Sequence, residues 1–397
     1  MPISDRAKKI GISPTMKIAA VAIEMRARGE KIIDLAVGEP DFPTPVNIKN
    51  AAKLALDQNE TRYTLNQGRR DLRDAVANKL KNENGVQYSA DEIIISTGAK
   101  QCIFNAVQAL VHEGDEVIFS SPYYVSYPEM VVLAHGRSVV IPSDEKTYFK
   151  ITADQLKKTI TSVSKLLVLN YPCNPTGSCY DRSELSDIAE IVEKNNLYVI
   201  SDEIYENLLY DGNEFVSFSS LSEVIKSRTV LINGFSKSYA MTGWRIGYSA
   251  GPEEIINAMN RIQSHSTSNA SSISQAAAYE ALTGPQQFIQ TMRNEYQTRR
   301  DFFYERIISI EGISCHKPQG AFYLFPNVST FFNRSFESFN IENSFDLAMY
   351  LLSEAKIAAV PGSAFGAEGY LRLSYSTSIE NLRDAADRIK ESLEKLR

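Results

Sequence analysis

The stretch with the clearest chemical potential is Asn233–Tyr248, which reads NGFSKSYAMTGWRIGY. Its lysine, Lys237, lies shortly after a buried apolar run, in a loop of small and hydroxyl-bearing residues. An amine in such a place can lose its hydration, which lowers its pKa and makes the neutral, nucleophilic form available. Arg245, eight residues further on, offers a planar fork of donors that suits a phosphate dianion. The simpler interpretation of either residue alone is a surface cation in a loop, so both interpretations are open at this point.

A second segment suited to phosphate is Ser96–Gln101, which reads STGAKQ. It lies between an Ile-rich run and a helical pattern, so the amides of Gly98 and Ala99 would open a helix. Small residues let a phosphate approach these amides, and the helix N-terminus adds a favourable partial charge. The segment has neither the spacing of a nucleotide P-loop nor that of a dinucleotide-binding turn. Taken alone it is a weak signal.

Helices and strands must hold these two segments in place. Between about residues 90 and 250, short apolar runs alternate with amphipathic helical patterns, which predicts a mostly parallel sheet covered by helices on both faces. Past about residue 285, a long helical pattern, a mixed region and a last helix opening near Ser378 predict a smaller α+β domain. We expect an α/β protein with a large domain at residues 46–284 and a small domain at 1–45 and 285–397. The apolar runs are 93–95, 117–119, 166–169, 198–200 and 230–232.

Composition excludes several functional classes. A chain of 397 residues is long enough for two domains, and a net charge of −6 does not favour binding to nucleic acid or to an anionic membrane. The N-terminus lacks the apolar core of a secretory signal, and no apolar run is long enough to cross a bilayer. The four cysteines and four histidines show no metal-binding spacing. We expect a cytoplasmic protein that binds no metal, nucleic acid or membrane.

The 233–248 stretch closely resembles the Schiff-base signature of the class I and II aminotransferases of pyridoxal phosphate (PLP) fold type I. The resemblance extends from about residue 31 to the C-terminus. It implies that Lys237 carries PLP as a Schiff base and, once released, moves the substrate's proton as general base and then acid. The segment SDEIY, residues 201–205, resembles the element in which Asp202 keeps the pyridine nitrogen protonated. Tyr205 would donate to the 3′-oxygen of the cofactor.

Other cofactor contacts follow from the same resemblance. Asn174, in NYPCNPTG at 170–177, would share the 3′-oxygen with Tyr205. Tyr124 would stack on the pyridine ring, although a tyrosine in this aromatic-rich chain can also simply pack in a core. Tyr63 would reach the phosphate of the neighbouring subunit, which implies a homodimer with a shared active site. The remaining phosphate contacts would come from Gly98, Ala99, Ser236 and Arg245.

Substrate contacts are also implied. Arg372, in YLRLSY, matches the arginine that binds the α-carboxylate through two parallel hydrogen bonds. Gly38, in AVGEPDF, resembles the residue whose bare backbone passes close over the substrate. Tyr124 and Asn174 would contact the substrate as well as the cofactor.

Within the family, the sequence is most similar to the bacterial aspartate aminotransferases of subgroup Iβ. There, a lysine in the place of Lys100 reads the distal carboxylate of aspartate, although Lys100 can also simply extend into water from the first turn of its helix. The sequence departs from the pattern of other subgroups at Gly234, where they have a phosphate-binding serine. It also has Ile12 where members that accept prephenate have a basic residue.

The expected function is therefore PLP-dependent transamination between an L-amino acid, aspartate first, and 2-oxoglutarate. Several alternatives remain open at this point. One group consists of aromatic, alanine and prephenate aminotransferases and the cystathionine β-lyases, which share the fold. The others are a PLP-binding transcription regulator and a relative that binds the cofactor without catalysis.

Overall fold

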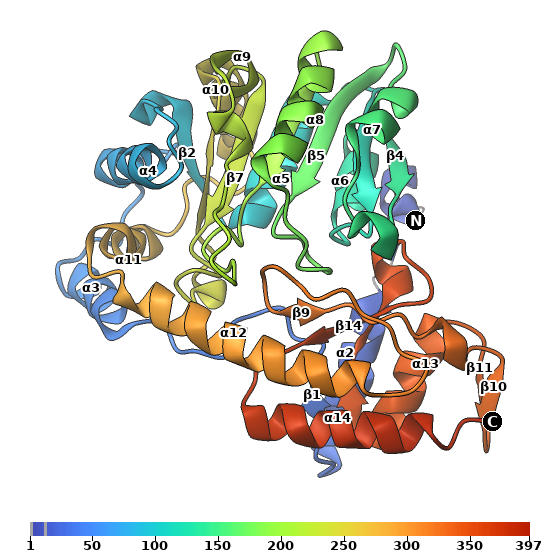
Figure 1. Cartoon of the computed structure of the whole chain (residues 1–397). Coiled ribbons are helices and arrows are strands. Elements are labelled where there is room, and N and C mark those ends of the chain that lie inside the picture. Colours follow the sequence, from blue (N-terminus) through green and yellow to red (C-terminus); the bar gives the residue numbers. More distant parts are fainter. Residues whose placement is uncertain (1–2, 12–13) are drawn as a thin grey trace.

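The computed structural model describes residues 3–11 and 14–397, and a seven-stranded sheet lies at its centre (Figure 1). The strand order is β2-β8-β7-β6-β5-β3-β4, and all neighbours from β7 to β4 are parallel. Only β8 is antiparallel, to both β2 and β7. The predicted α/β class is confirmed. The strands are β2 (Ile93–Ser96), β3 (Glu116–Ser121), β4 (Arg137–Pro142), β5 (Ser164–Asn170), β6 (Tyr198–Asp202), β7 (Thr229–Gly234) and β8 (Gly247–Ala250).

The five predicted apolar runs all lie in strands of this sheet, but β4 and β8 were not predicted. The outer strand β4 leaves most of its side chains exposed or partly exposed, but its sequence does contain an apolar run, 139–141, that the sequence analysis did not single out. The sequence of β8 is GYSA, in which small residues replace the usual Val and Ile. Only β8 is therefore specified by its neighbours more than by its own sequence.

Helices cover both faces of the sheet, because its strands alternate the direction of buried side chains. One face packs Ile94, Phe119 and Ile200 against α5, α6 and α10. The other packs Ile118 and Val199 against α7, α8 and α9. A capping box starts α8, in which the side chains of Asp181 and Glu184 accept hydrogen bonds from each other's backbone amides. The helices are α3 (Val46–Asp57), α4 (Arg70–Glu83), α5 (Ala99–Leu110), α6 (Tyr127–Leu133), α7 (Ala153–Thr159), α8 (Arg182–Lys194), α9 (Glu223–Lys226), α10 (Glu253–Ser264) and α11 (Ser272–Thr283).

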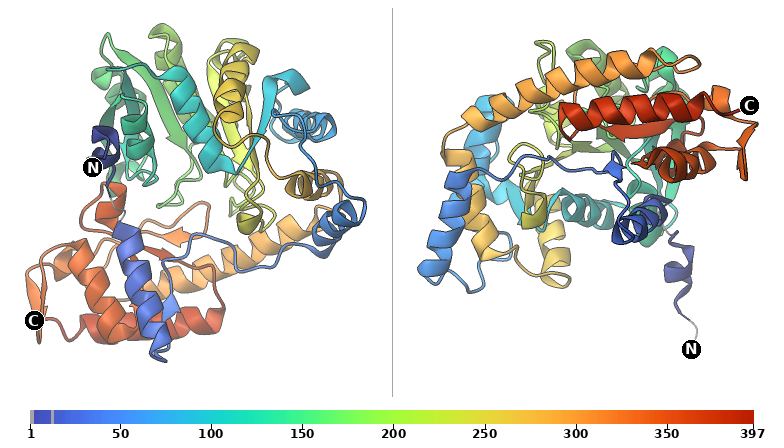
Figure 2. Two further views of the ribbon diagram at one scale, coloured as in Figure 1. Left: turned by 180° about the vertical axis from the view of Figure 1, so that it is seen from behind. Right: turned by 90° about the horizontal axis from the view of Figure 1, so that it is seen from below.

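A second hydrophobic core joins the two ends of the chain. Ile18, Ala22 and Leu35 pack with residues from 323 to 396, and β1 pairs in parallel with β12. Figure 2 shows α2 lying against the C-terminal segments in both views. The elements are α1 (Asp5–Lys9), α2 (Pro14–Ala27), β1 (Ile33–Asp34), α12 (Gln287–Ile308), β9 (Tyr323–Leu324), β10 (Arg334–Phe336), β11 (Phe339–Ile341), α13 (Ser344–Tyr350), β12 (Ile357–Ala358), β13 (Val360–Pro361), β14 (Leu371–Ser374) and α14 (Ile379–Leu393).

The division into domains at 46–284 and at 1–45 with 285–397 stays a prediction. The two cores on the faces of the sheet support it, although the core between the two chain ends also includes Ile204, Tyr205, Leu208 and Tyr210 of the larger predicted domain.

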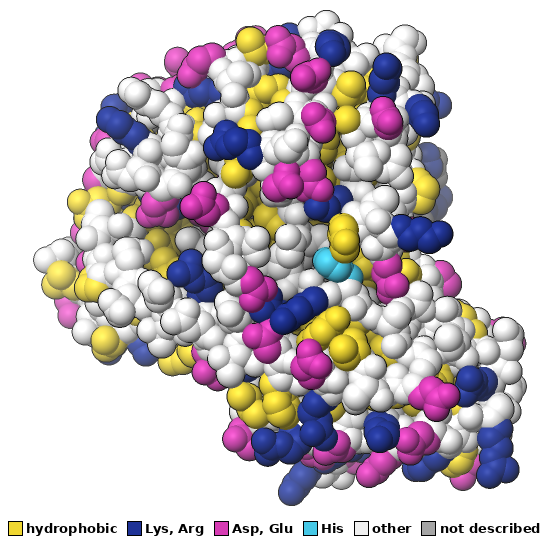
Figure 3. Space-filling model, viewed as in Figure 1, with side chains coloured by type: hydrophobic (Ala, Val, Ile, Leu, Met, Phe, Trp, Pro, Cys, Tyr) yellow, Lys and Arg dark blue, Asp and Glu magenta, His cyan; other side chains and the backbone are white. Residues whose placement is uncertain are grey.

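The surface in Figure 3 mixes both signs of charge. Acidic and basic side chains are interspersed over the sheet layer, which holds the seven-stranded sheet and its helices, and over the C-terminal layer, which consists of the elements α2, β1 and α12 to α14 around the second core. Within residues 3–11 and 14–397, no helix is both long enough and apolar enough to cross a membrane. The same residues contain no cluster of three or more His, Cys, Asp or Glu side chains arranged to hold a metal ion.

Candidate active site

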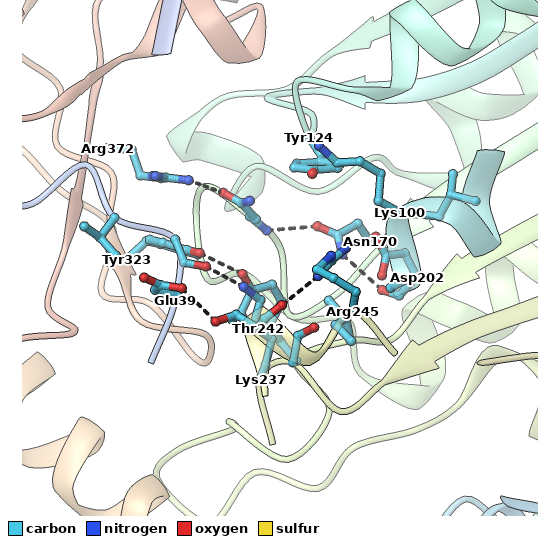
Figure 4. Close-up of a pocket in the computed structure, with 18 residues that line it drawn as sticks. Glu39, Lys100, Tyr124, Asn170, Asp202, Lys237, Thr242, Arg245, Tyr323 and Arg372 are labelled. Atoms are coloured by element: carbon cyan, nitrogen blue, oxygen red, sulfur yellow. Dashed lines mark hydrogen bonds between the residues drawn. The ribbon is translucent and has the colours of Figure 1, made fainter. Parts of the chain in front are cut away.

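A cavity of about 810 Å³ lies where strands β5, β6 and β7 end. Because these parallel strands are neighbours, the residues at their carboxyl ends are brought together, and Asn170 is the register partner of Asp202. Figure 4 shows side chains from β6, from the loop after β7 and from the C-terminal layer converging on this space. Of the residues predicted from the sequence, those lining it are Gly38, Ala99, Lys100, Tyr124, Asn174, Asp202, Tyr205, Ser236, Lys237, Arg245 and Arg372.

Lys237 is partly buried between the two layers. Its Nζ donates a hydrogen bond to the backbone oxygen of Gly38 and lies 5.6 Å from the ring centroid of Tyr205. Burial first and the positive charge of Arg372 second lower the pKa of Lys237 to about 8, against the negative charge of Glu39. About a tenth of the amine is therefore neutral at pH 7, far more than for a lysine in water, as the sequence analysis expected from desolvation.

Asp202 ends β6 with a carboxylate that is only 5% exposed. Its Oδ2 accepts a hydrogen bond of 2.7 Å from the hydroxyl of Tyr127, whereas its Oδ1 is buried and has no hydrogen-bond partner among the described residues. Burial raises the pKa of Asp202 to about 6, against the opposing effects of the Tyr127 hydroxyl, the Ile204 amide and the Lys237 charge. A buried oxygen without a partner at the wall of a cavity is suited to a donor on a ligand.

Two hydrogen bonds connect the wall of the cavity to the C-terminal layer. The hydroxyls of Tyr205 and Tyr323 are 2.7 Å apart, although they lie on different layers. Arg372, which is 6% exposed, donates from Nη1 to Oδ1 of Asn174 at 3.0 Å and from Nη2 to the backbone oxygen of Ala36 at 2.6 Å. Its guanidinium lies 4.4 Å from the ring centroid of Tyr323. These contacts fix the direction of the guanidinium and leave its Nε without a partner among the described residues.

A corner of small residues lies at the start of α5. A Cβ on Gly98, whose φ is 86°, would lie 2.5 Å from Nη2 of Arg245, and a Cβ on Gly247 would lie 2.6 Å from the amide nitrogen of Ala99. Only glycine allows the guanidinium and the helix N-terminus to approach each other this closely. The exposed Arg245 donates to the backbone oxygens of Thr242 and Thr97 at 2.8 and 3.4 Å. The corner thus presents amides and a cation together, which suits a phosphate.

Tyr124 and Lys100 lie on the opposite side of the cavity from Arg372 and Tyr323 (Figure 4). The Lys100 Nζ is 5.6 Å from the ring centroid of Tyr124. The edge of that ring also packs against Tyr127, at 5.5 Å between centroids and an interplanar angle of 78°. The cavity therefore has cationic side chains on two opposite sides and an aromatic ring between them.

Tyr63 does not line this cavity in its own chain. It is 91% exposed and lies beside Asn269 and Ser271 in a separate surface hollow. Ile12 stands where members of the family that accept prephenate have a basic residue, and it lies outside the described residues.

These residues fit PLP. The buried Oδ1 of Asp202 lacks the donor that a protonated ring nitrogen supplies, and the corner at Gly98 can take a phosphate. Lys237 provides an amine whose pKa is lowered by burial. PLP has a matching group for each of them: an aldehyde for the amine, a basic ring nitrogen for the carboxylate, and a phosphate for the corner of small residues.

The residues of the cavity and its wall that the sequence analysis missed include Asn170, Tyr127, Tyr323 and Glu39. Asn170 donates to the backbone oxygen of Asp202 and accepts from the amide of Asn174. Glu39 accepts a hydrogen bond of 2.7 Å from Thr242. Asn170 and Glu39 lie inside segments that were singled out, so those segments were the available signal. Nothing in the sequence links Tyr127 to Asp202 or Tyr323 to Tyr205.

Comparisons with known proteins agree with this geometry. The family model "Aminotransferase class I and II" matches residues 30–389. An aspartate aminotransferase from Bacillus sp. (strain YM-2) is 46% identical over 98% of each chain. An aspartate/prephenate aminotransferase from Nitrosomonas europaea is 44% identical over 99% of this chain and 100% of that one.

Two solved structures are also similar. An aspartate aminotransferase from Rhizobium meliloti is 41% identical with a TM-score of 0.96 over 100% of both chains. One from Thermus thermophilus, solved with maleate, is 39% identical with a TM-score of 0.93 over 99% of this chain and 100% of that one.

Proposed function

This chain belongs to the class I and II aminotransferases, PLP is its cofactor, and we propose that it transfers the amino group of aspartate to 2-oxoglutarate. One observation carries the choice of substrate: Arg372 and Lys100 line the same cavity from opposite sides. A dicarboxylic amino acid has two negative charges for these two cations, whereas alanine or an aromatic amino acid has only one. The maleate in the Thermus thermophilus structure is a dicarboxylate as well, and that enzyme is named for aspartate.

The residue roles are part of this proposal. Lys237 would bond to the cofactor's aldehyde, and Asp202 would hold a proton on its ring nitrogen. Tyr205 and Asn174 would donate to its 3′-oxygen, and Tyr124 would stack on its ring. The phosphate would be held by Ser236 and Arg245 and by the amides of Gly98 and Ala99. When bound, PLP supplies an electron sink that stabilises negative charge on the substrate's Cα.

The chain's own residues would orient the substrate and move its proton. Arg372 has its guanidinium fixed by Asn174 and Ala36, and it would bind the α-carboxylate and so set the direction of the Cα–H bond. The backbone of Gly38 would pass close over the substrate. The Nζ of Lys237 would take the Cα proton as a general base and later return a proton as a general acid. Its pKa of about 8 suits both tasks, because proton transfer is most efficient near the operating pH.

A homodimer with a shared active site is the second part of the proposal. Tyr63 is exposed and does not line its own cavity, and the nearby α3 and the loop after it leave Val46, Leu54, Leu56 and Leu65 exposed. Apolar side chains gathered on one region of a surface are typical of an interface. A second copy docked there would bring its Tyr63 toward the open corner at Arg245. The cytoplasmic location stays a prediction.

The substrate is tested by mixing the PLP-loaded enzyme with single amino acids and following loss of the yellow cofactor absorbance. We expect aspartate and glutamate to react faster than alanine, phenylalanine or tyrosine. Lys100→Met should lower kcat/KM for aspartate by about tenfold and leave alanine nearly unchanged, because only aspartate has a second carboxylate. Equal losses for both amino acids would contradict the role of Lys100. Pyruvate and ammonia from cystathionine would instead indicate a lyase.

Prephenate is a second candidate substrate, because several similar relatives are named for both aspartate and prephenate. It also has two carboxylates, which would suit the same pair of cations. Including prephenate as an acceptor for the amino group in the same assay decides between a single and a dual activity.

A further inference from the structure

Tyr127 lies outside the residues that line the cavity, yet it contacts two of them. It is the first residue of α6 and is 3% exposed. Its hydroxyl donates to Oδ2 of Asp202 at 2.7 Å, and its ring packs edge-on against Tyr124 at 5.5 Å and against Phe119 at 6.1 Å. One side chain thus supports both the carboxylate and the aromatic ring that face the same space.

We propose that Tyr127 is a positioning residue that keeps the Asp202 carboxylate ionised and directs its free oxygen, Oδ1, at the cofactor's ring nitrogen. This inference rests on the placement of PLP in the proposed function. The Tyr127 hydroxyl occupies one oxygen of Asp202, so the other oxygen remains for the ligand. A buried carboxylate without a donor would take up a proton and could no longer stabilise a protonated ring.

The Tyr127 hydroxyl is a donor that does not titrate in the useful range, because burial and the Asp202 charge raise its pKa well above the usual value. The pKa of Asp202 itself, about 6 with this hydrogen bond present, leaves its carboxylate mostly ionised at pH 7. Loss of the hydroxyl removes an effect that lowers this pKa. The variant should therefore need a higher pH to keep Asp202 charged.

Other titratable groups near Asp202 do not obscure the shift of its pKa, because their charges change little below pH 7.5. Cys102 from α5 and Cys173 from the loop after β5 both have their pKa raised to about 11 by burial. Tyr205 has its pKa raised well above the usual value for the same reason. Lys237, with a pKa of about 8, is mostly protonated there in every variant.

The test measures binding of pyridoxine 5′-phosphate to apoenzyme between pH 5 and 7.5, followed by the fluorescence of Trp244, the single tryptophan. This analogue has no aldehyde, so it cannot bond to Lys237, and its phosphate titrates alike in all variants. In the wild type, affinity should fall on acidification with a midpoint near the Asp202 pKa of about 6. In Tyr127→Phe, the midpoint should move up by about one pH unit, so that affinity is about fivefold lower at pH 6 and nearly unchanged at pH 7.5.

Matched variants separate a positioning role from a structural one. Tyr350→Phe removes another fully buried hydroxyl, which donates to the backbone oxygen of Ser392 at 2.7 Å in the C-terminal layer, and it should leave the profile unchanged. Asp202→Asn should leave only the acid limb that comes from the analogue's phosphate, and adding Tyr127→Phe to it should then shift nothing.

An equal loss of affinity at every pH in Tyr127→Phe, or an unmoved midpoint, would overturn the role of Tyr127. If instead the wild type and Asp202→Asn have the same pH profile and bind equally tightly, the ring nitrogen does not meet Asp202. That result would overturn the placement of the cofactor together with the inference.

Discussion

The floor of the cavity, formed by Asp202, Lys237 and Arg372, differs from its rim, formed by Lys100 and Arg245 and completed, in the proposed homodimer, by Tyr63 of a second copy. On the floor, Asp202 is 5% and Arg372 is 6% exposed, and burial shifts the pKa of Asp202 up and that of Lys237 down. On the rim, Lys100 and Arg245 are exposed and Tyr63 is 91% exposed. The floor residues all come from one chain, whereas the exposed rim is where the proposed homodimer would add a residue from a second copy.

This difference indicates a division of labour. Removing water from the floor strengthens every electrostatic interaction there, so its residues can change protonation states and fix bond directions. Charges on the rim are screened by water, and each contributes modestly to binding. Substitutions on the floor should therefore cost orders of magnitude in rate, and substitutions on the rim should cost small factors in affinity.

The largest effect should come from Lys237→Ala. It removes the amine that would both bond the cofactor and move the Cα proton, and we expect transamination to fall by at least about 10⁴-fold. The yellow absorbance of bound PLP should disappear too, as visible spectra of the purified variant will show. Lys194→Ala, at an exposed i,i+4 pair with Glu190, is the control and should retain full activity. Borohydride trapping that labels another lysine would sink the assignment.

Arg372→Lys should have the next largest effect. A lysine keeps the charge but loses the fork of donors that binds a carboxylate at two points, and it cannot replace both the bond to Asn174 and the bond to Ala36. We expect kcat/KM to fall by about 100-fold for aspartate and alanine alike, because both present an α-carboxylate. Steady-state kinetics with the two donors measures this. A loss confined to aspartate would mean that Arg372 reads the side chain instead.

The sequence predicted most of the sheet from its apolar runs, whereas the residues of the floor were singled out mainly by the resemblance to a known family. Lys237, Asp202 and Asn174 lie in local segments whose order along the chain places them at the ends of adjacent parallel strands. Contacts between distant segments were not predictable, since Tyr127 and Asp202 are 75 residues apart and Tyr205 and Tyr323 are 118 apart. No local sequence pattern predicts that a tyrosine at the start of a helix will contact a carboxylate at the end of a strand far along the chain.

Glu203, the residue after Asp202, allows a test of how a buried carboxyl makes the stability of the protein depend on pH. It is fully buried, Oε1 accepts from Ser201 and Ser217, and Oε2 has no partner among the described residues. Burial raises the pKa of Glu203 from 4.5 to about 8. Its folded pKa exceeds the unfolded one, so the stability it contributes is complete below pH 4.5 and is lost as pH rises through 8.

Glu203→Gln replaces the carboxyl with an amide that does not titrate. Relative to the wild type, the variant's Tm should therefore rise by about 3 °C between pH 5 and pH 8. Thermal unfolding of the holoenzyme at several pH values measures the difference. Parallel curves for the two proteins would show that Glu203 does not carry the proton we assign to it.

The smallest effect should come from the rim, at Tyr63. If its hydroxyl reaches the phosphate in the partner subunit, Tyr63→Phe should weaken PLP binding by about three- to tenfold, the contribution of one hydrogen bond. Equilibrium dialysis of apoenzyme against PLP measures this, and gel filtration should show a dimer for both proteins.

A mixture of two variants tests the sharing directly. Refolding Lys237→Ala together with Tyr63→Ala should produce hybrid dimers in which one site has both native residues, so about a quarter of all sites are complete. At limiting PLP, the mixture should then exceed the average activity of the separate variants. If activity equals that average, Tyr63 acts within its own chain or not at all, and the rim does not depend on a second copy.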